Sequence, residues 1–582
     1  MDTKQTNIKA TVFRIWKYLD VYRKQLLLVL FLVLISSAFA LLGPYVIGYA
    51  IDEYIAKDVT NHFGTIILLI VSVYFIFSIS SFLQNYSMIG IGQKTVFTMR
   101  DQLFKQLHHL PISFFDKRQH GELMSRITND IDNVSQTLNS SIIQIFSSVL
   151  TLIGTITMML ILSPTLTLVS MIVIPLMFFG MKWITKRTSR YFKKQQKHLG
   201  QLNGFIEETI SGQKIVKAFS QEEKMINEFI DNNTKLKEAG YWAQTYSGFI
   251  PKLMNVLNNL SFAIIAGVGG YLALKGHISI GVIVVFTEYS RQFTRPLNDL
   301  ANQFNTLLSA VAGAERVFEI LDEKTIEEKK QYKTIANIDG EIIFDRVSFA
   351  YGTDKDTIED ITFQTKPGET TALVGPTGAG KSTVINLLAR FYSINSGSIY
   401  IDGINLEQFH QDDIRQHLGF VLQDAYLFEG TVKDNIRYGL LEASDDEVVQ
   451  AARLANAHDF IMSLPDQYET KLTQNGQGIS QGQKQLISIA RAMLRKPSIL
   501  ILDEATSNID TITELKIQDA LTRLMEGRTS IVIAHRLNTI QQADQIIVLD
   551  DGKMIEKGTH QSLIQQGGFY SDLVSHQFQQ AN

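Results

Sequence analysis

The stretch that decides the fold of the second half of the chain is Gly375-Pro376-Thr377-Gly378-Ala379-Gly380-Lys381-Ser382. It matches the pattern G-x-x-x-x-G-K-[ST], in which glycines let the backbone wrap closely around phosphate. Residues 370–374 before it predict a buried strand, and residues 383–390 after it predict a helix. On such a strand-to-helix turn, the backbone N–H groups and the Lys381 ammonium can hold phosphate, and the Ser382 hydroxyl can ligate Mg²⁺. A chance glycine turn is the alternative, and the residues downstream decide against it.

Composition divides the chain into two parts. The sequence has 582 residues, 45% of them hydrophobic, with charge scarce in several long N-terminal segments and abundant after about residue 320. The net charge of −4 offers no basic excess for nucleic acid, so we expect no nucleic-acid partner. The absence of cysteine excludes disulfides, thiolate metal sites and cysteine nucleophiles. Residues 1–24 are polar and amphipathic, unlike a signal peptide.

The first part of the chain has the pattern of a polytopic membrane protein. Residues 11–24 alternate apolar and basic side chains at helical spacing, which predicts a helix lying in the cytoplasmic membrane interface. Six apolar segments of membrane-spanning length follow, at about 25–50, 64–90, 139–162, 166–186, 247–274 and 279–300. Ser163-Pro164-Thr165 separates the third from the fourth and predicts a tight hairpin, because proline breaks a helix. Six such segments in series exclude a soluble ATPase.

Loop charge predicts the orientation. The connections 91–138 and 187–246 are long and rich in lysine and arginine, so we expect them to lie in the cytoplasm as helical extensions. The N-terminus would then be cytoplasmic too. Two stretches, 114–130 and 207–217, combine apolar residues with glycine breaks, which favours short helices that dock on another domain. A simple helix-turn-helix is the alternative.

The last apolar segment carries the charged residues Glu288, Arg291 and Arg295. Charges at membrane depth usually face a bundle interior or an aqueous cavity, which favours a cavity-lining role for Glu288. Alternatively, the two arginines reach the cytoplasmic interface or pair with Glu288. We therefore predict an all-α membrane domain over residues 1–325, a charged linker over 326–337, and an α/β nucleotide-binding domain over 338–582.

Polar residues follow the apolar strands predicted in the second domain. Asp503 and Glu504 end the strand 499–502, where Asp503 can hold Mg²⁺ and Glu504 can polarise the water that attacks the γ-phosphate. His535 follows the strand 531–534 and can contact the γ-phosphate. These positions predict an ATPase.

Two further residues complete the predicted site. Gln423 follows another strand and can sense the metal and the water. Tyr351 follows residues 347–350 and offers a ring on which adenine can stack. Each residue alone is more often structural, but their joint occurrence in this order indicates function.

With these motifs, the sequence resembles an ATP-binding cassette (ABC) exporter half-transporter over essentially its whole length. The family's signature, usually Leu-Ser-Gly-Gly-Gln, corresponds to Ile479-Ser480-Gln481-Gly482-Gln483, and Ser507-Asn508-Ile509-Asp510 matches its D-loop. The resemblance implies that two such domains sandwich two ATP molecules with Mg²⁺. It also implies that the stretches 114–130 and 207–217 are coupling helices, the second of which docks on the partner chain. The nucleotide-binding set implied is Tyr351, Gly375, Pro376, Thr377, Gly378, Ala379, Gly380, Lys381, Ser382, Thr383, Ser480, Gly482, Gln483 and Asp510, with Ser382, Gln423 and Asp503 as metal ligands.

The chain departs from the family pattern at the signature. Gln481 stands at the first signature glycine, and the preceding segment 473–478 is shortened, with glutamine where glutamate is usual. A side chain there would crowd the helix N-terminus that meets the γ-phosphate. A complete catalytic set with a weakened signature is similar to one half of heterodimeric multidrug exporters, whose partner has a normal signature and no catalytic glutamate. A homodimer that tolerates Gln481 is the alternative.

The resemblance implies ATP-driven export of amphipathic drugs or lipids from the cell membrane, with the nucleotide-binding domain in the cytoplasm. The predicted partners are a second ABC half-transporter, membrane lipids and an amphipathic small molecule. A homodimeric lipid or peptide exporter is one alternative, and a nucleotide-gated channel or sensor is another. Intact Glu504 and His535 favour a pump over a gate.

Overall fold

The computed structural model describes residues 8–57, 63–325, 332–333, 337–352, 356–423, 425–473, 476, 478–503, 509–534 and 537–578. Within them the chain forms two compact units. One contains the chain up to His108 together with His120–Glu323, and the other contains His109–Gln119 together with the chain from Lys324 onward. A short segment from the N-terminal half therefore belongs to the second unit.

The first unit is helical throughout its described residues, as predicted. Its helices include three π-helical segments, labelled η. Their bounds are α1 (Ile8–Asp20), α2 (Arg23–Ala50), η1 (Ile51–Ile55), α3 (Phe63–His109), α5 (His120–Ser125), η2 (Arg126–Asp130), α6 (Ile131–Gln136), η3 (Thr137–Ser141), α7 (Ile142–Leu162), α8 (Pro164–Ser170), α9 (Val173–Ser211), α10 (Gln213–Ala218), α11 (Glu222–Leu274) and α12 (Ile280–Leu321).

Five helical stretches in the described part of the chain are long and apolar enough to cross a membrane. They are Arg23–Ile55, Phe63–His109, His120–Leu162, Pro164–Ser211 and Glu222–Leu274. The sixth predicted segment lies in α12, which is not among the five because Glu288, Arg291 and Arg295 interrupt its apolar sequence. The hairpin at Ser163 is confirmed: its hydroxyl accepts a hydrogen bond from the N–H of Leu166, and Pro164 occupies the first position of α8.

The amphipathic N-terminal helix is α1, which starts before the predicted 11–24 and ends at Asp20. It packs on the C-terminal part of α12, where Arg14 pairs with Asp322 at 2.5 Å and its guanidinium lies 4.2 Å from the centre of the Phe318 ring. Phe13, next to Arg14 in the sequence, is 73% exposed. One face of α1 is therefore held by protein, and the other is free for the membrane interface.

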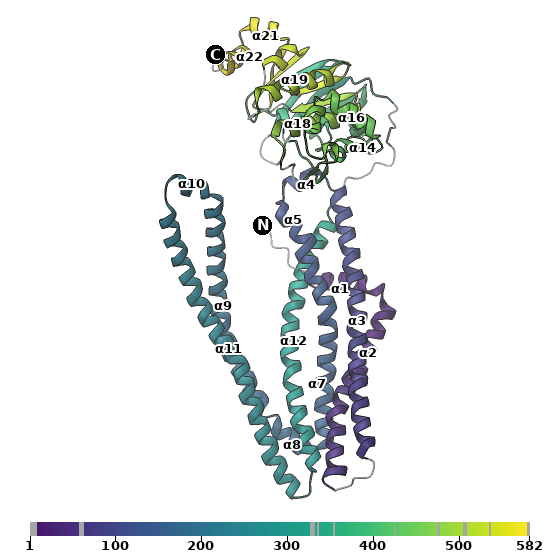
Figure 1. The fold of residues 1–582 in the computed structure, drawn as a ribbon, viewed down its shortest axis with the longest axis vertical. Helices are drawn as coiled ribbons and strands as arrows, with labels where there is room; N and C mark the ends of the chain where they lie inside the picture. The colour runs from purple at the N-terminus through teal and green to yellow at the C-terminus, as the bar shows by residue number, and fades with distance from the viewer. Residues whose placement is uncertain are drawn as a thin grey trace. The chain divides into compact units, whose positions relative to one another are not determined.

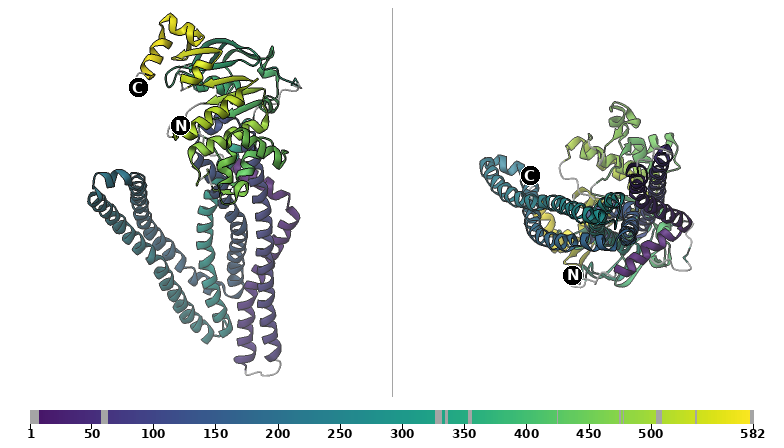
Figure 2. Two further views of the ribbon diagram at one scale, coloured as in Figure 1. Left: turned by 45° about the horizontal axis from the view of Figure 1, so that its top comes forward. Right: turned by 90° about the horizontal axis from the view of Figure 1, so that it is seen from below.

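The predicted cytoplasmic loops are long helical extensions. Figures 1 and 2 show α9 and α11 side by side, joined by the short helix α10. The extension that starts at α5 is tied to α12 by ion pairs: buried Asp130 accepts two hydrogen bonds from Arg316, at 2.8 and 2.5 Å. Arg126, also buried, pairs with Glu319 at 2.8 Å. These contacts fix the direction of the extension against α12.

The second unit contains the α/β domain and the short helix α4 (Ile112–Asp116). Its strands are β1 (Ile342–Phe349), β2 (Ile358–Thr365), β3 (Thr370–Val374), β4 (Ser396–Ile401), β5 (Ile404–Asn405), β6 (Leu418–Val421), β7 (Gly430–Thr431), β8 (Lys471–Leu472), β9 (Ile499–Asp503), β10 (Thr529–Ile533), β11 (Gln545–Asp550) and β12 (Lys553–Gly558). Its other helices are α13 (Lys381–Leu388), α14 (Gln411–His417), α15 (Val432–Arg437), α16 (Asp445–Leu454), α17 (His458–Met462), α18 (Gln481–Arg495), α19 (Thr511–Met525), α20 (Leu537–Gln542), α21 (His560–Gln566) and α22 (Phe569–Phe578), with 3-10 turns η4 (Leu406–Gln408) and η5 (Gln467–Glu469).

The main sheet has the order β12-β11-β3-β10-β9-β6 among the described residues. The five strands from β11 to β6 are parallel, and β12 is antiparallel. A second, antiparallel sheet has the order β2-β1-β4-β5. The predicted fold class, a helical membrane domain followed by a P-loop α/β domain, is confirmed.

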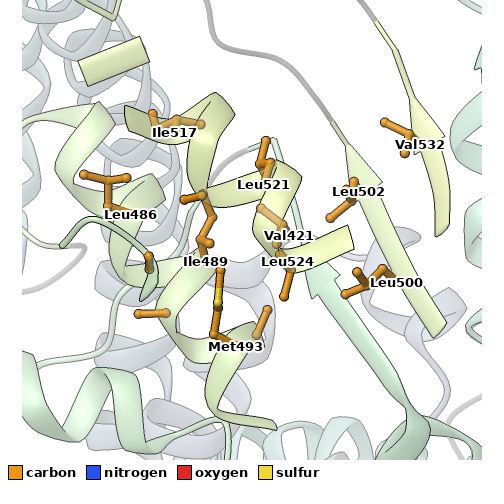
Figure 3. Close-up of a cluster of buried hydrophobic side chains, with 14 of the residues drawn as sticks. Val421, Leu486, Ile489, Met493, Leu500, Leu502, Ile517, Leu521, Leu524 and Val532 are labelled. Atoms are coloured by element: carbon orange, nitrogen blue, oxygen red, sulfur yellow. The ribbon is translucent and has the colours of Figure 1, made fainter. Parts of the chain in front are cut away.

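Helices α18 and α19 cover one face of the main sheet, as Figure 3 shows. Leu486, Ile489 and Met493 of α18 meet Ile517 and the leucines of α19, and both helices face strand residues such as Leu500 and Leu502. These side chains are almost fully buried. Burial of apolar area contributes roughly 25 cal/mol per Å², so it is the main stabilisation of this layer. The core thereby fixes the N-terminus of α18, which carries the signature.

Candidate active site

The glycine-rich loop lies where the sequence predicts it, between β3 and α13. β3 is a parallel strand between β11 and β10, and four of its five residues are buried. Gly380 precedes α13 with φ of 96°, a left-handed conformation that favours glycine. A Cβ at Gly375 would lie 2.1 Å from the carbonyl oxygen of Leu549, so no side chain fits there. Both glycines are therefore required by the backbone path.

Lys381 is the first residue of α13 and is 7% exposed. Its ammonium donates hydrogen bonds to the carbonyl oxygens of Gly375 at 2.8 Å and Pro376 at 2.9 Å. Burial lowers the pKa of Lys381, and the nearby Asp503 carboxylate opposes that shift. The positive charge is thus held over the loop, beside an acidic side chain. Of the other loop residues, Pro376, Thr377, Gly378 and Ser382 are exposed, while Ala379 and Thr383 are buried.

Strand register brings the predicted metal ligands to one edge of the sheet. Asp503 ends β9, where it is level with Ile533 of β10, and β10 pairs with β3, which leads into the loop. On the other side of β9, Val421 of β6 is level with Leu502, so Gln423 follows at the same edge. The carboxylate, the Gln423 amide and the Ser382 hydroxyl are hard oxygen donors of the kind that Mg²⁺ prefers. Their chemistry and common edge fit that ion.

Tyr351 packs against the helix that follows the phosphate-binding loop. Its hydroxyl donates to Thr383 Oγ1 at 3.3 Å and accepts from Asn386 Nδ2 at 3.2 Å. Its ring meets Phe349 and Tyr392 edge to face, each at 4.9 Å between centroids. The side chain is 41% exposed, so one face of the ring is available for stacking.

The signature lies at the N-terminus of α18. Ser480 caps this helix: its hydroxyl accepts from the Gln483 N–H at 3.2 Å, and Gln483 Oε1 accepts from the Ser480 N–H at 2.8 Å. Gln481 is the first helical residue and is exposed, whereas Gly482 is buried. A Cβ at Gly482 would lie 2.5 Å from Thr513 Cγ2. The fold therefore requires the second signature glycine and leaves room for a side chain at the first.

Asp510 is the N-cap of α19, and its carboxylate accepts a hydrogen bond from the Thr513 N–H at 2.9 Å. This hydrogen bond lowers the pKa of Asp510. Two predicted catalytic residues, Glu504 and His535, lie outside the described residues, as do Ser507 and Asn508 of the D-loop.

Sequence reasoning missed Tyr392, the residue that connects Tyr351 to α4. Tyr392, whose ring packs on Tyr351, donates its hydroxyl to the carboxylate of Asp116, the last residue of α4. Phe114 anchors the same helix and is buried. Because Asp116 and Tyr392 are 276 positions apart in sequence, no local pattern predicts their contact.

Sequence families match both parts of the chain. The ABC transporter transmembrane region matches residues 26–297, and the ABC transporter family matches residues 358–507. The chain is 59% identical over 577 residues to an uncharacterized ABC transporter ATP-binding protein, YfiC, of Bacillus subtilis, covering 99% of this chain and 96% of that protein. It is 42% identical over 482 residues to a fatty acid ABC transporter ATP-binding/permease protein of Mycobacterium tuberculosis, covering 83% and 76% of the two chains.

Two further relatives are an ATP-dependent lipid A-core flippase and a solved exporter. The flippase, from Syntrophus aciditrophicus, is 35% identical over 548 residues, covering 94% of this chain and 91% of that protein. A bacterial Atm1-family ABC exporter, solved with ATP bound, superposes with a TM-score of 0.76 at 28% identity, covering 96% of this chain and 99% of the other.

The chain therefore belongs to the ABC transporter family and has the exporter architecture. It is a multi-pass membrane protein with a cytoplasmic nucleotide-binding domain. Its activity is that of an ATPase coupled to transport. ABC exporters act as dimers, so two such halves form the working assembly.

Proposed function

We propose that this chain is one half of a heterodimeric exporter that moves amphipathic drugs or lipids across the membrane by alternating access, with one fully competent ATP site. Two relatives, named for fatty acids and for lipid A-core, support a lipid-like substrate. In this proposal the membrane domain spans residues 1–325 and the nucleotide-binding domain spans residues 338–582, joined by the linker 326–337.

In the proposed site, Lys381 and the N-terminus of α13 bind the β- and γ-phosphates, and Tyr351 stacks on adenine. Ser382, Gln423 and Asp503 would hold Mg²⁺, which neutralises charge on the phosphates. Glu504 orients the attacking water, and His535 contacts the γ-phosphate. Ser480, Gly482, Gln483 and Asp510, with the rest of the phosphate-binding loop, complete the sandwich across the dimer.

The observation that supports the heterodimer proposal is that Gln481 is exposed while its neighbour Gly482 is buried. Because the fold leaves Gln481 free, its side chain projects from the helix end that meets the partner's nucleotide in this family. A chain with a complete catalytic set and such a signature would place its weakened surface against a partner site that does little hydrolysis. A homodimer that tolerates Gln481 remains the competing proposal.

Vesicle transport tests the function. The chain, purified with the partner that co-purifies from its native membrane, is reconstituted in proteoliposomes, and uptake of a fluorescent amphiphile is followed against its gradient. We expect uphill accumulation that needs ATP and is abolished by vanadate and by Glu504→Gln, because the variant keeps the shape of the site and loses the water-orienting carboxylate. Downhill flux that is independent of hydrolysis would instead identify a channel.

A further inference from the structure

A polar cavity of about 360 Å³ lies between α2, α3, α7 and α12 in the membrane unit. Hydroxyl groups from α2, α3 and α7 line it, together with the carboxamides of Gln84, Asn85, Gln144 and Gln292. Ala40, Phe77, Ile143 and Pro296 add apolar surface to the lining. So much hydrogen-bonding capacity is unusual among membrane helices, where polar side chains are costly and commonly mark ligand sites.

The cavity lies at membrane depth. On α12 its lining runs from Gln292 to Asp299, about 18 to 28 Å along the helix from Ile280 at 1.5 Å per residue. On α2 it includes Ser36, about 20 Å along the helix from Arg23. With a hydrocarbon core about 30 Å thick, the α12 positions lie in its inner half and Ser36 lies just beyond its middle, so the cavity reaches from the middle of the core toward the cytoplasmic boundary.

Two hydrogen bonds between helices hold the cavity walls. Ser36 Oγ of α2 donates to Gln84 Oε1 of α3 at 3.0 Å, and both side chains are buried. Gln144 Nε2 of α7 donates to Asp299 Oδ2 of α12 at 2.7 Å. Because each bond joins two helices, the polar surface is preorganised rather than formed on demand.

Two buried polar atoms in this cavity have no hydrogen-bond partner among the described residues. They are Ser37 Oγ on α2 and Gln292 Oε1 on α12. Buried polar atoms are normally satisfied, so unpaired ones lining a cavity indicate that a ligand or water pairs with them. The Gln292 oxygen can only accept, so its partner must be a donor, whereas the Ser37 hydroxyl can donate or accept.

The charges of the cavity restrict the ligand further. Arg295 and Asp299 both line it and carry opposite charges. Because these charges cancel, the cavity does not favour a ligand with a net charge. A carboxylate or phosphate headgroup could engage Arg295, but neither ion offers a donor to Gln292 Oε1. An ammonium could donate to both atoms but could not accept from the Arg295 guanidinium. A hydroxyl group does both, and several adjacent hydroxyls match a wall of amides and hydroxyls.

We propose that this cavity binds the headgroup of a neutral, polyhydroxylated amphiphile, such as a glycosylated diacylglycerol. The inference rests on the proposed export function and narrows its substrate class. Ser37 of α2 and Gln292 of α12 bind the headgroup hydroxyls, and Arg295 and Asp299 supply opposite charges that balance. The acyl chains remain outside the cavity, in an apolar environment.

The test compares three probes with identical acyl chains: a diacylglycerol with a disaccharide headgroup, the same diacylglycerol without the sugar, and the free fatty acid. ATPase stimulation is titrated in proteoliposomes that contain the full-length assembly. We expect the sugar lipid to stimulate at concentrations about tenfold lower than the other two. Ser37→Ala and Gln292→Leu should each raise its half-maximal concentration about five- to tenfold, the loss expected for one hydrogen bond.

Thr155→Val is the matched control. Thr155 also has a buried hydroxyl without a partner among the described residues and lies on the same helix as Gln144, but it does not line the cavity. This variant should titrate like the wild type. Equal stimulation by all three probes, no response to the sugar lipid, or an equal effect of Thr155→Val and Gln292→Leu would each overturn the proposal. Ser37→Ala keeps the test decisive if Gln292→Leu does not fold.

Failure of this inference differs from failure of the proposed function. If ATP drives transport of the fatty acid but not of the sugar lipid, and Glu504→Gln abolishes it, the exporter function stands and the headgroup proposal falls. If no probe moves in an ATP-dependent manner, the exporter function falls as well.

Discussion

Lys381 holds the positive charge of the phosphate-binding loop in a buried position. Its ammonium lies on the carbonyl oxygens of Gly375 and Pro376, which shield it from water. A compact point charge on a flexible stem suits phosphate, and the backbone dipoles of the loop cannot replace it. The buried position also lowers the pKa of Lys381, so a negative phosphate would stabilise its charged form.

Lys381→Ala should weaken ATP binding and turnover together. At roughly 1.5 to 3 kcal/mol for a hydrogen bond to a charged group, the dissociation constant for ATP should rise about ten- to a hundredfold. Equilibrium binding of a fluorescent ATP analogue measures the effect, with the exposed Lys366 replaced by alanine as the control. Wild-type affinity and turnover in the variant would remove this loop from the mechanism.

Gly482 and Gln481 are neighbours in sequence with opposite structural roles. Gly482 faces α19, where a Cβ would lie 2.5 Å from Thr513 Cγ2 and 3.0 Å from Ile509 Cγ2. Gln481 is exposed at the start of α18. Substitution should therefore affect folding at one position and only the facing surface at the other.

Gly482→Ala should destabilise the nucleotide-binding domain by about 1 to 3 kcal/mol, the usual cost of overpacking. Gln481→Ala should change stability by less than about 0.5 kcal/mol, because its side chain is exposed. Thermal unfolding of the two variants of the full chain, side by side, measures the difference. Equal melting temperatures would contradict the packing at Gly482.

At the scale of elements, α4 belongs to the second unit because of a small set of contacts. Phe114 is buried, the Arg118 guanidinium lies 4.4 Å from its ring centre, and Asp116 accepts the Tyr392 hydroxyl. Tyr392 in turn packs on Tyr351, which is hydrogen-bonded to α13. A continuous series of contacts thus joins the helix behind the phosphate-binding loop to α4.

Tyr392→Phe should reduce the stimulation of ATP hydrolysis by transport substrate and leave nucleotide binding intact. The variant keeps the ring that packs on Tyr351 and loses only the hydroxyl that reaches Asp116. We expect basal ATPase within about twofold and a clear loss of substrate stimulation. When Tyr392→Phe is combined with Asp116→Asn, their effects on substrate stimulation, expressed as free energies, should be non-additive by about 0.5 to 3 kcal/mol.

Tyr400→Phe is the control, since Tyr400 lies on β4 and its hydroxyl makes no hydrogen bond with the described residues. Additive effects of Tyr392→Phe and Asp116→Asn would separate the two side chains energetically. Equal loss in the control would attribute the effect to stability rather than to coupling.

At the scale of the whole molecule, we expect two surfaces to contact a second chain. The tip between α9 and α11 exposes Ile210, Ile215 and Phe219, each more than 60% exposed, although apolar groups of this size usually find a partner. The N-terminus of α18 presents Gln481. We expect the first surface to dock on the partner chain and the second to face the partner's nucleotide.

Gln481→Gly should change nucleotide retention at the partner's site without doubling hydrolysis, because in a heterodimer that site lacks its own catalytic carboxylate. Purified alone, the chain should form few active dimers, and adding the native partner should restore turnover. ATPase per competent site and nucleotide occupancy measure both effects. A uniform homodimer with two equivalent, fully active sites would establish the competing homodimeric exporter.

The sequence alone determined much of this protein because its strongest signals are local. The loop from Gly375 to Ser382, the strand and the helix that flank it, and the hairpin at Pro164 follow from patterns a few residues long. Glycine and proline restrict the backbone wherever they stand, and apolar runs of sufficient length predict membrane helices without tertiary information. The fold class and the position of the nucleotide site were therefore predictable.

Only the tertiary structure decided what depends on contacts between distant segments. The Tyr392–Asp116 contact, the close approach of Gly482 to α19, and the polar cavity around Gln292 each join residues that no sequence pattern relates. The positions of Gln481 and Gly482 are both glycine in the usual signature. Their structural roles differ because α19 packs on Gly482, whereas Gln481 is exposed. Packing makes that choice, because it depends on which surfaces meet in three dimensions and not on the spacing of residues along the chain.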